Sequence, residues 1–360
     1  MGNVPHLRFP EFSGEWENTE LQYIAPNICS GKDKPTSNGT VALYGSTGII
    51  GMTRLASYNE EIVLVARVGA NAGQLQITTI PCGVTDNTLI INAKEWNRYI
   101  YYYLQHYNLN RLVFGSGQPL ITGSMLKKLK IIYGEESERN KIVNLLCLLD
   151  ERIATQNKII EDLKKLKCAI IEKLYTEIQG EEYSYGQLLE IVNERNKQMG
   201  YSNILSASQE KGMVNREDLN LDIQFEHNNI STYKIVREGD YVIHLRSFQG
   251  GFAFSDKLGV CSPAYTILRP NRLLEFGYLS YYFMSQRFIK SLIIVTYGIR
   301  DGRSINVEEW LNMKTVIPSK EHQLHILKVL RSIEGKIKNE ETYATCLSNQ
   351  KQYLLQQMFI

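Results

Sequence analysis

Arginine and amide side chains lie beside glycines at several places in this 360-residue chain. Arginine can pair with guanine edges or phosphates, and asparagine and glutamine can pair with adenine. Up to half of the set or more could equally be ordinary surface or salt-bridged residues, and Asp301 could pair with its arginine neighbours. The candidate DNA contacts in the first half are Ser46, Thr47, Arg54, Arg67, Asn71, Gln74 and Gln118. Those in the second half are Arg246, Ser247, Gln249, Arg300 and Arg303.

Patterns of catalysis or metal binding do not emerge from the sequence. The stretch Gly45–Gly51 lacks the Gly-Lys-Ser/Thr ending that a phosphate-binding loop needs, and is better explained as a glycine turn in a β-rich domain or a loop that approaches DNA. His322 and His325 have no further ligand nearby, so a solvated helix face explains them better than a metal site. The tetrapeptides used to methylate DNA amino groups and a glycine-rich S-adenosylmethionine site are also missing. We therefore expect no catalysis by this chain alone.

Composition limits the class of protein. A net charge of +2 excludes a uniformly basic coat for nucleic acid but permits a local basic face. There is no run of 18 apolar residues and no basic-then-apolar secretory pattern at Met1–Arg8. The six cysteines are scattered without a C-x-x-C pair, which is typical of reduced thiols. We expect a cytoplasmic protein with no membrane association.

A helical segment occurs twice, 184 residues apart, and its apolar residues recur at spacings of four and three. This spacing predicts a coiled-coil seam, interrupted by polar Gln156 and Glu340, with Leu166 or Lys167 continuing it. A helix over residues 137–178 would be roughly 60 Å long, which suits a spacer. The predicted helix-pairing residues are Ile142, Leu146, Leu149, Ile153, Leu163, Ile170, Leu174, Ile326, Leu330, Ile333, Ile337, Leu347, Leu354 and Met358.

Each long helix follows a region with mixed patterns, which predicts an α+β fold of two similar globular domains. The expected domains are 1–136 and 179–318, followed by helices 137–178 and 319–360. Ser137 and Ser319 are the expected helix starts. In the first domain we expect helices at Trp16–Ile28 and Tyr99–Tyr107, with the three tyrosines at 101–103 in helix core or rim, and strands at Ile62–Ala66, Thr88–Ile91 and Leu129–Ile132.

The order of these features resembles the specificity subunit of type I restriction–modification systems, over essentially the whole chain. The resemblance rests on the two helices, the opening Pro5–Phe12 before Trp16, and the loops Tyr44–Gly51 and Arg67–Gly73. The helical motif reads Leu148-Leu149-Asp150-Glu151-Arg152-Ile153 in the first copy, and the second copy ends Gln356-Gln357-Met358-Phe359. One departure is Gly335 in place of an acidic residue, which weakens the helix locally by roughly 1 kcal/mol relative to alanine.

The resemblance implies that each globular domain is a target recognition domain reading one half of a split DNA site. It implies that the two helices pack antiparallel and hold the domains apart with pseudo-twofold symmetry. Two methyltransferase subunits would methylate adenine N6, and restriction subunits could join them. The cofactor S-adenosylmethionine would sit on the methyltransferase partner, and this chain would carry none.

Two other classes of function stay open at this point. One is a stand-alone DNA-modifying enzyme, either a nuclease or a methyltransferase, for which the catalytic patterns are missing. The other is a coiled-coil adaptor with two protein-binding domains.

Overall fold

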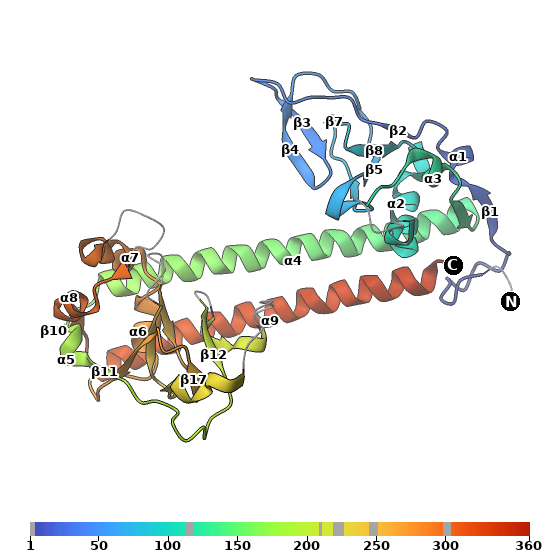
Figure 1. Cartoon of the computed structure of the whole chain (residues 1–360). Coiled ribbons are helices and arrows are strands. Elements are labelled where there is room, and N and C mark those ends of the chain that lie inside the picture. Colours follow the sequence, from blue (N-terminus) through green and yellow to red (C-terminus); the bar gives the residue numbers. More distant parts are fainter. Residues whose placement is uncertain (1–3, 113–118, 209–210, 219–226, 245–250, 298–303) are drawn as a thin grey trace. The chain divides into compact units, whose positions relative to one another are not determined.

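The computed structural model describes residues 4–112, 119–208, 211–218, 227–244, 251–297 and 304–360. The chain divides into two compact units, the first made of Met1–Lys158 with Glu341–Ile360 and the second of Ile159–Glu340. Each unit contains a globular α+β domain and part of two long helices, α4 (Glu136–Thr176) and α9 (Lys320–Met358) (Figure 1). None of the helices in the described ranges is long and apolar enough to cross a membrane.

The two long helices pack antiparallel in each unit. In the first unit, the Nζ atom of Lys351 on α9 lies 2.6 Å from a carboxylate oxygen of Asp150 on α4. In the second unit, Nζ of Lys167 on α4 lies 2.6 Å from a carboxylate oxygen of Glu334 on α9. The residue numbers of the two pairs have the same sum, so both pairs follow a single antiparallel register.

Apolar residues line the seam between the helices. Each of the fourteen predicted helix-pairing residues is buried or partly buried. Lys167, and not Leu166, continues the seam, since Leu166 is 51% exposed while the Lys167 side chain is 15% exposed. Polar Gln156 is buried in the seam, and α9 continues as an α-helix through Gly335.

The first domain combines a four-stranded sheet in the order β2-β8-β5-β6, a three-stranded sheet in the order β4-β3-β7, and the pair β1-β9. Its strands are β1 (Glu17–Glu20), β2 (Cys29–Ser30), β3 (Val41–Gly45), β4 (Gly48–Thr53), β5 (Val63–Ala66), β6 (Leu75–Ile77), β7 (Cys82–Val84), β8 (Thr88–Ile91) and β9 (Lys130–Tyr133). Its short helices are α1 (Leu21–Ile24), α2 (Asn97–Tyr107) and α3 (Gly123–Lys127).

The second domain contains a four-stranded sheet in the order β11-β18-β15-β16 and the pairs β10-β21, β12-β13, β14-β17 and β19-β20. Its first strands are β10 (Glu181–Ser184), β11 (Leu189–Val192), β12 (Leu205–Ser208), β13 (Gly212–Asn215), β14 (Lys234–Val236) and β15 (Tyr241–Ile243). The others are β16 (Phe252–Phe254), β17 (Gly259–Cys261), β18 (Thr266–Pro270), β19 (Thr296–Tyr297), β20 (Ser304–Ile305) and β21 (Lys314–Ile317). Its helices are α5 (Tyr185–Leu188), α6 (Tyr278–Tyr282), α7 (Gln286–Ser291) and α8 (Val307–Asn312).

The two domains share their central topology. Both four-stranded sheets place the third strand of the hydrogen-bonded order before the second one in the chain, with antiparallel pairing throughout. In both, the strand that leads into a long helix (β9 or β21) pairs with the strand that opens the domain (β1 or β10). The expectation of two similar α+β domains with a repeated long helix is therefore confirmed.

Two local predictions are wrong. The expected helix Trp16–Ile28 is instead the strand β1 followed by the single turn α1, because residues 17–20 pair with β9. The expected cap Ser137 lies inside the first turn of α4, since the N–H of Arg139 already donates to the carbonyl of Glu135 at 3.0 Å. Ser319 does cap α9, where its hydroxyl accepts from the N–H of His322 at 3.3 Å.

The tyrosine-rich helix α2 belongs to the core of the first unit, as predicted. Tyr102 and Tyr103 are each 3% exposed and Tyr101 is partly buried. The hydroxyl of Tyr99 donates to the carbonyl of Ile132 at 2.8 Å, and that of Tyr103 donates to the carbonyl of Lys130 at 3.1 Å. These bonds attach α2 to β9, the strand that continues into α4.

Candidate functional site

Two turns of the first domain meet at the backbone carbonyl of Asn87. The hydroxyl of Ser46, in the turn between β3 and β4, donates to this carbonyl at 3.2 Å. The N–H of Arg67, at the end of β5, donates to the same oxygen at 3.0 Å. The side-chain amide of Gln76 donates to the carbonyls of Gly45 and Ser46 at 3.0 and 2.9 Å. The β3–β4 turn is therefore held against the β5–β6 sheet edge.

Glycine gives the β5–β6 turn its shape. Gly69 and Gly73 have φ values of 78° and 91°, a region that disfavours side chains with a Cβ. The turn closes through a bond of 2.9 Å from the N–H of Ala66 to the carbonyl of Gln74. The side chains of Asn71 and Gln74 remain exposed on it. Both amides can therefore hydrogen-bond to a ligand without displacing a protein partner that the turn requires.

Arg67 and Arg54 differ in their surroundings. Arg67 is partly buried, with Nη1 3.4 Å from the hydroxyl of Ser30 and a buried Nε that has no hydrogen-bond partner among the described residues. Arg54 is exposed near the far end of β4, where Nε donates to the carbonyl of Ser37 at 3.1 Å. The structure thus brings five candidates together and leaves Arg54 apart from them. We define these five as the first recognition face: Ser46, Thr47, Arg67, Asn71 and Gln74.

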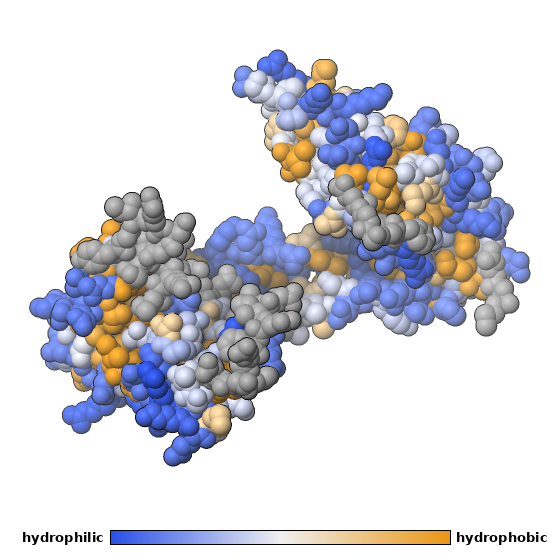
Figure 2. All heavy atoms as spheres, viewed as in Figure 1, coloured by the Kyte–Doolittle hydropathy of each residue, from blue (hydrophilic) through white to orange (hydrophobic). Residues whose placement is uncertain are grey.

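Apolar side chains border this face and escaped the search for polar contacts. Ile49 and Ile50, at the start of β4, are 56% and 54% exposed. Hydrophobic residues lie among hydrophilic ones over the visible surface of both domains in Figure 2. Exposed apolar groups can contact thymine methyl groups, while hydroxyl, amide and guanidinium groups hydrogen-bond to bases or phosphates. The only sequence signal for them was their place in the glycine-rich stretch.

Six of the candidate DNA contacts lie outside the described residues, along with Asp301. Arg246, Ser247 and Gln249 belong to the segment between β15 and β16, the topological counterpart of the β5–β6 turn. The others are Gln118, Arg300 and Arg303.

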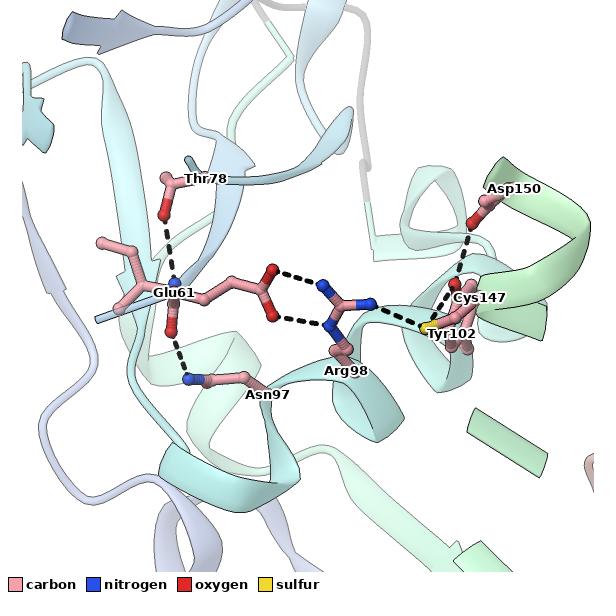
Figure 3. A network of polar contacts seen from close by, with 8 residues as sticks. Glu61, Thr78, Asn97, Arg98, Tyr102, Cys147 and Asp150 are labelled. Atoms are coloured by element: carbon pink, nitrogen blue, oxygen red, sulfur yellow. Dashed lines mark hydrogen bonds and ion pairs between the residues drawn. The ribbon is translucent and has the colours of Figure 1, made fainter. Parts of the chain in front are cut away.

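A polar network connects the first sheet to the long helices (Figure 3). Both carboxylate oxygens of Glu61, just before β5, accept from Arg98 of α2 at 2.7 and 2.8 Å. Arg98 also donates to the Cys147 sulfur of α4 at 2.8 Å. The hydroxyl of Tyr102 donates to Asp150 at 2.8 Å and lies 3.4 Å from the same sulfur. Hydrogen bonding to Glu61 raises the pKa of Arg98, and burial raises that of Tyr102.

Sequence reasoning missed this network, although the repeat contained a signal for it. Asp150 and Glu334 occupy equivalent positions in the two copies, as do Lys167 and Lys351. Within the described ranges, no group of three or more His, Cys, Asp or Glu side chains could hold a metal ion. His322 and His325 are exposed on α9. The described groups are suited to binding and positioning.

Comparison with known proteins places the chain in a DNA-recognition family. A sequence model described as the type I restriction modification DNA specificity domain matches residues 6–165. The type I restriction enzyme MjaVIII specificity subunit of Methanocaldococcus jannaschii is 25% identical over 320 residues, which cover 78% of this chain and 73% of that protein.

Solved structures share the fold. The S subunit of a type I restriction–modification system from M. genitalium has a TM-score of 0.61 at 15% identity, over 99% of both chains. A chain from a study of complex assembly and conformational transition of the type I R-M system has a TM-score of 0.59 at 15% identity, over 98% of both chains. At this level of identity the likeness concerns the fold.

Proposed function

Because this chain belongs to the specificity subunits of type I restriction–modification systems, we propose that it reads a DNA site in two halves, one with each unit. Members of this family are the non-catalytic components that recognise DNA sequence. The proposal therefore concerns how this chain divides the recognition between its two domains.

The repeated attachment of a domain to the same helix pair carries the proposal. Both units build the same four-stranded sheet and contact α4 and α9 through a tyrosine, a carboxylate and a lysine. The candidate contacts on the two domains differ: Asn71 and Gln74 lie in the first β-turn, and Arg246, Ser247 and Gln249 in its counterpart. Like scaffolds with unlike contact residues are what two different half-sites would require.

We further propose that the helix pair holds two methyltransferase subunits, each methylating adenine N6 in one half-site, and that restriction subunits can join them. S-adenosylmethionine would bind to those methyltransferases, and the assembly would work in the cytoplasm. One structural relative comes from a study of type I complex assembly, which supports a role for this fold in assembly. The near-balanced charge of +2 supports partners that supply further phosphate contacts.

Methylome sequencing of a strain with and without the gene tests the proposal. We expect one bipartite adenine-methylation motif to disappear with the gene and to return when the intact chain is supplied from a plasmid. Loss of a continuous motif would contradict reading in two halves, and an unchanged methylome would contradict the function altogether. Binding of the purified chain to proteins alone, with no DNA binding in the presence of a methyltransferase, would favour an adaptor.

A further inference from the structure

The same three-residue contact occurs once in each unit. In the first unit, the hydroxyl of Tyr102 donates to Oδ2 of Asp150 at 2.8 Å, and Nζ of Lys351 lies 2.6 Å from Oδ1. We call these three residues the first junction. The lysine also lies 5.4 Å from the centre of the tyrosine ring, within the range of a cation–π contact.

The second junction is made of Tyr281, Glu334 and Lys167. The hydroxyl of Tyr281 donates to Oε2 of Glu334 at 2.6 Å, and Nζ of Lys167 lies 2.6 Å from Oε1. Lys167 lies 5.5 Å from the centre of the Tyr281 ring. In both junctions, one carboxylate oxygen accepts from a tyrosine and the other pairs with a lysine.

Each junction connects a globular domain to both long helices. The tyrosine comes from a domain helix, α2 in one unit and α6 in the other. The acid and the lysine come from α4 and α9, which exchange these roles between the units. A single carboxylate therefore contacts the domain through one oxygen and the opposite long helix through the other. Its position fixes how the domain is oriented on the helix pair.

Burial distinguishes the junctions from ordinary surface ion pairs. Lys351 and Lys167 each have side chains only 15% exposed, whereas the pair Glu161–Lys165 on α4 has side chains 65% and 68% exposed. Exposed pairs of this second kind within one helix contribute little to stability. A hydrogen bond to a charged acceptor between elements far apart in the sequence has a greater effect on their relative orientation.

The first junction continues into the sheet that carries the recognition face. Arg98 links Glu61 at the start of β5 to Cys147, which lies beside the Tyr102 hydroxyl (Figure 3). Strand β5 ends at Arg67, a member of the first recognition face. A change in the orientation of Tyr102 would thus be transmitted to the strand that carries Arg67.

We propose that Asp150 and Glu334 are positioning residues, which orient each DNA-reading domain on the helix pair and so restrict the number of base pairs the protein accepts between the two half-sites. This inference rests on the proposed reading of DNA in two halves. It assigns the choice of gap length to the junctions as well as to the helices, while the bases of each half-site are left to the turns.

The test uses the full chain with its methyltransferase in cells, and plasmids that carry the motif with its natural gap or with one base pair more or fewer. Asp150→Ala should lower the preference for the natural gap by about tenfold, the scale of one lost hydrogen bond to a charged group. The bases of both half-sites should stay the same. Asp150→Glu, the acid found in the second junction, should restore most of the preference. Glu161→Ala is the matched control on α4 and should keep the wild-type preference.

Outcomes against the proposal are distinct from failure of the proposed function. Equal loss of methylation on all three plasmids, or an unchanged preference, would overturn the positioning role. If the wild-type protein itself methylates no fixed two-part site, the proposed function fails first. Should Asp150→Ala not fold, Tyr102→Phe provides the same test because it removes only the hydroxyl. Tyr281→Phe then tests the second junction in the same way.

Discussion

The guanidinium of Arg8 forms two hydrogen bonds, of 2.7 and 2.8 Å, with the buried carboxylate of Glu138 near the start of α4. Trp16 Nε1 donates to the same carboxylate at 3.0 Å, and the side chain of Glu138 is 1% exposed. A Cβ on Gly134 would come within 2.2 Å of this carboxylate, so only glycine leaves room for it. The opening segment, whose Leu7 N–H also donates to Gln357 of α9 at 2.9 Å, is thus part of the first unit's fold.

We expect Arg8→Ala to lower the free energy of unfolding by about 3 kcal/mol, since Glu138 would be left as a buried charge without its cation. Urea denaturation measures this. Glu11→Ala removes an exposed pair with Lys141 from the same segment and should cost less than about 1 kcal/mol. The double variant Arg8→Met with Glu138→Gln should recover most of the loss. An additive double variant would contradict the pairing.

The half-site prediction concerns the turns. Asn71→Ala should relax base preference in one half of the methylated site, because an exposed amide that can read adenine is lost from the first recognition face. Arg246→Ala should affect the other half only. Methylome sequencing of the two variants measures both, and Arg54→Ala serves as the control because Arg54 lies apart from the face. Weakening of both half-sites by either variant would argue against direct reading by these side chains.

The gap prediction concerns helix length. Because the Asp150–Lys351 and Glu334–Lys167 pairs share one register, an insertion must lengthen both helices equally. Four residues inserted after Gln156 and four after Glu340 add roughly 6 Å to each helix. The gap between the half-sites should grow by about two base pairs, at 3.4 Å each, with unchanged half-sites. The insertion in α4 alone should reduce methylation, because it displaces one ion pair from the shared register. Altered half-sites with an unchanged gap would contradict the spacer role.

The stability prediction for α9 concerns Gly335. This residue is exposed in the middle of the helix, and a Cβ placed on it meets no atom within 4 Å. Gly335→Ala should therefore raise the free energy of unfolding by up to about 1 kcal/mol. The reciprocal change Ala154→Gly, at an exposed position of α4, should lower it by a similar amount. A destabilised Gly335→Ala variant would show that the glycine serves a packing need.

The pH prediction concerns His106, whose ring stacks on Phe359 with centroids 5.8 Å apart. Burial lowers the pKa of His106, so the folded chain favours the neutral ring. Its contribution is present above the unfolded pKa of about 6.5 and is lost as the pH falls through that value. Between pH 8 and pH 5.5, the wild type should lose more stability than His106→Gln, as measured by urea denaturation at both values. Parallel losses would contradict the lowered pKa.

The sequence alone determined that the architecture occurs twice. Apolar spacing in the helices is a local property, and a change of 184 in residue number preserves it, so both long helices and their seam residues could be read directly. The strands at 63–66 and 88–91 were likewise apparent from short β-rich runs. Residues 17–20 were misread because only their pairing with β9 makes them a strand.

The tertiary structure alone decided which polar residues act together. Asp150 and Lys351 are 201 positions apart, and no local pattern relates them to Tyr102. The antiparallel register of α4 and α9 brings the acid to the lysine, and the packing of α2 brings the tyrosine to both. The same holds for Ser46 and Arg67, which meet at the carbonyl of Asn87 through a backbone contact that side-chain chemistry does not encode. Periodicity specifies an element, whereas the meeting of distant side chains depends on how the elements pack.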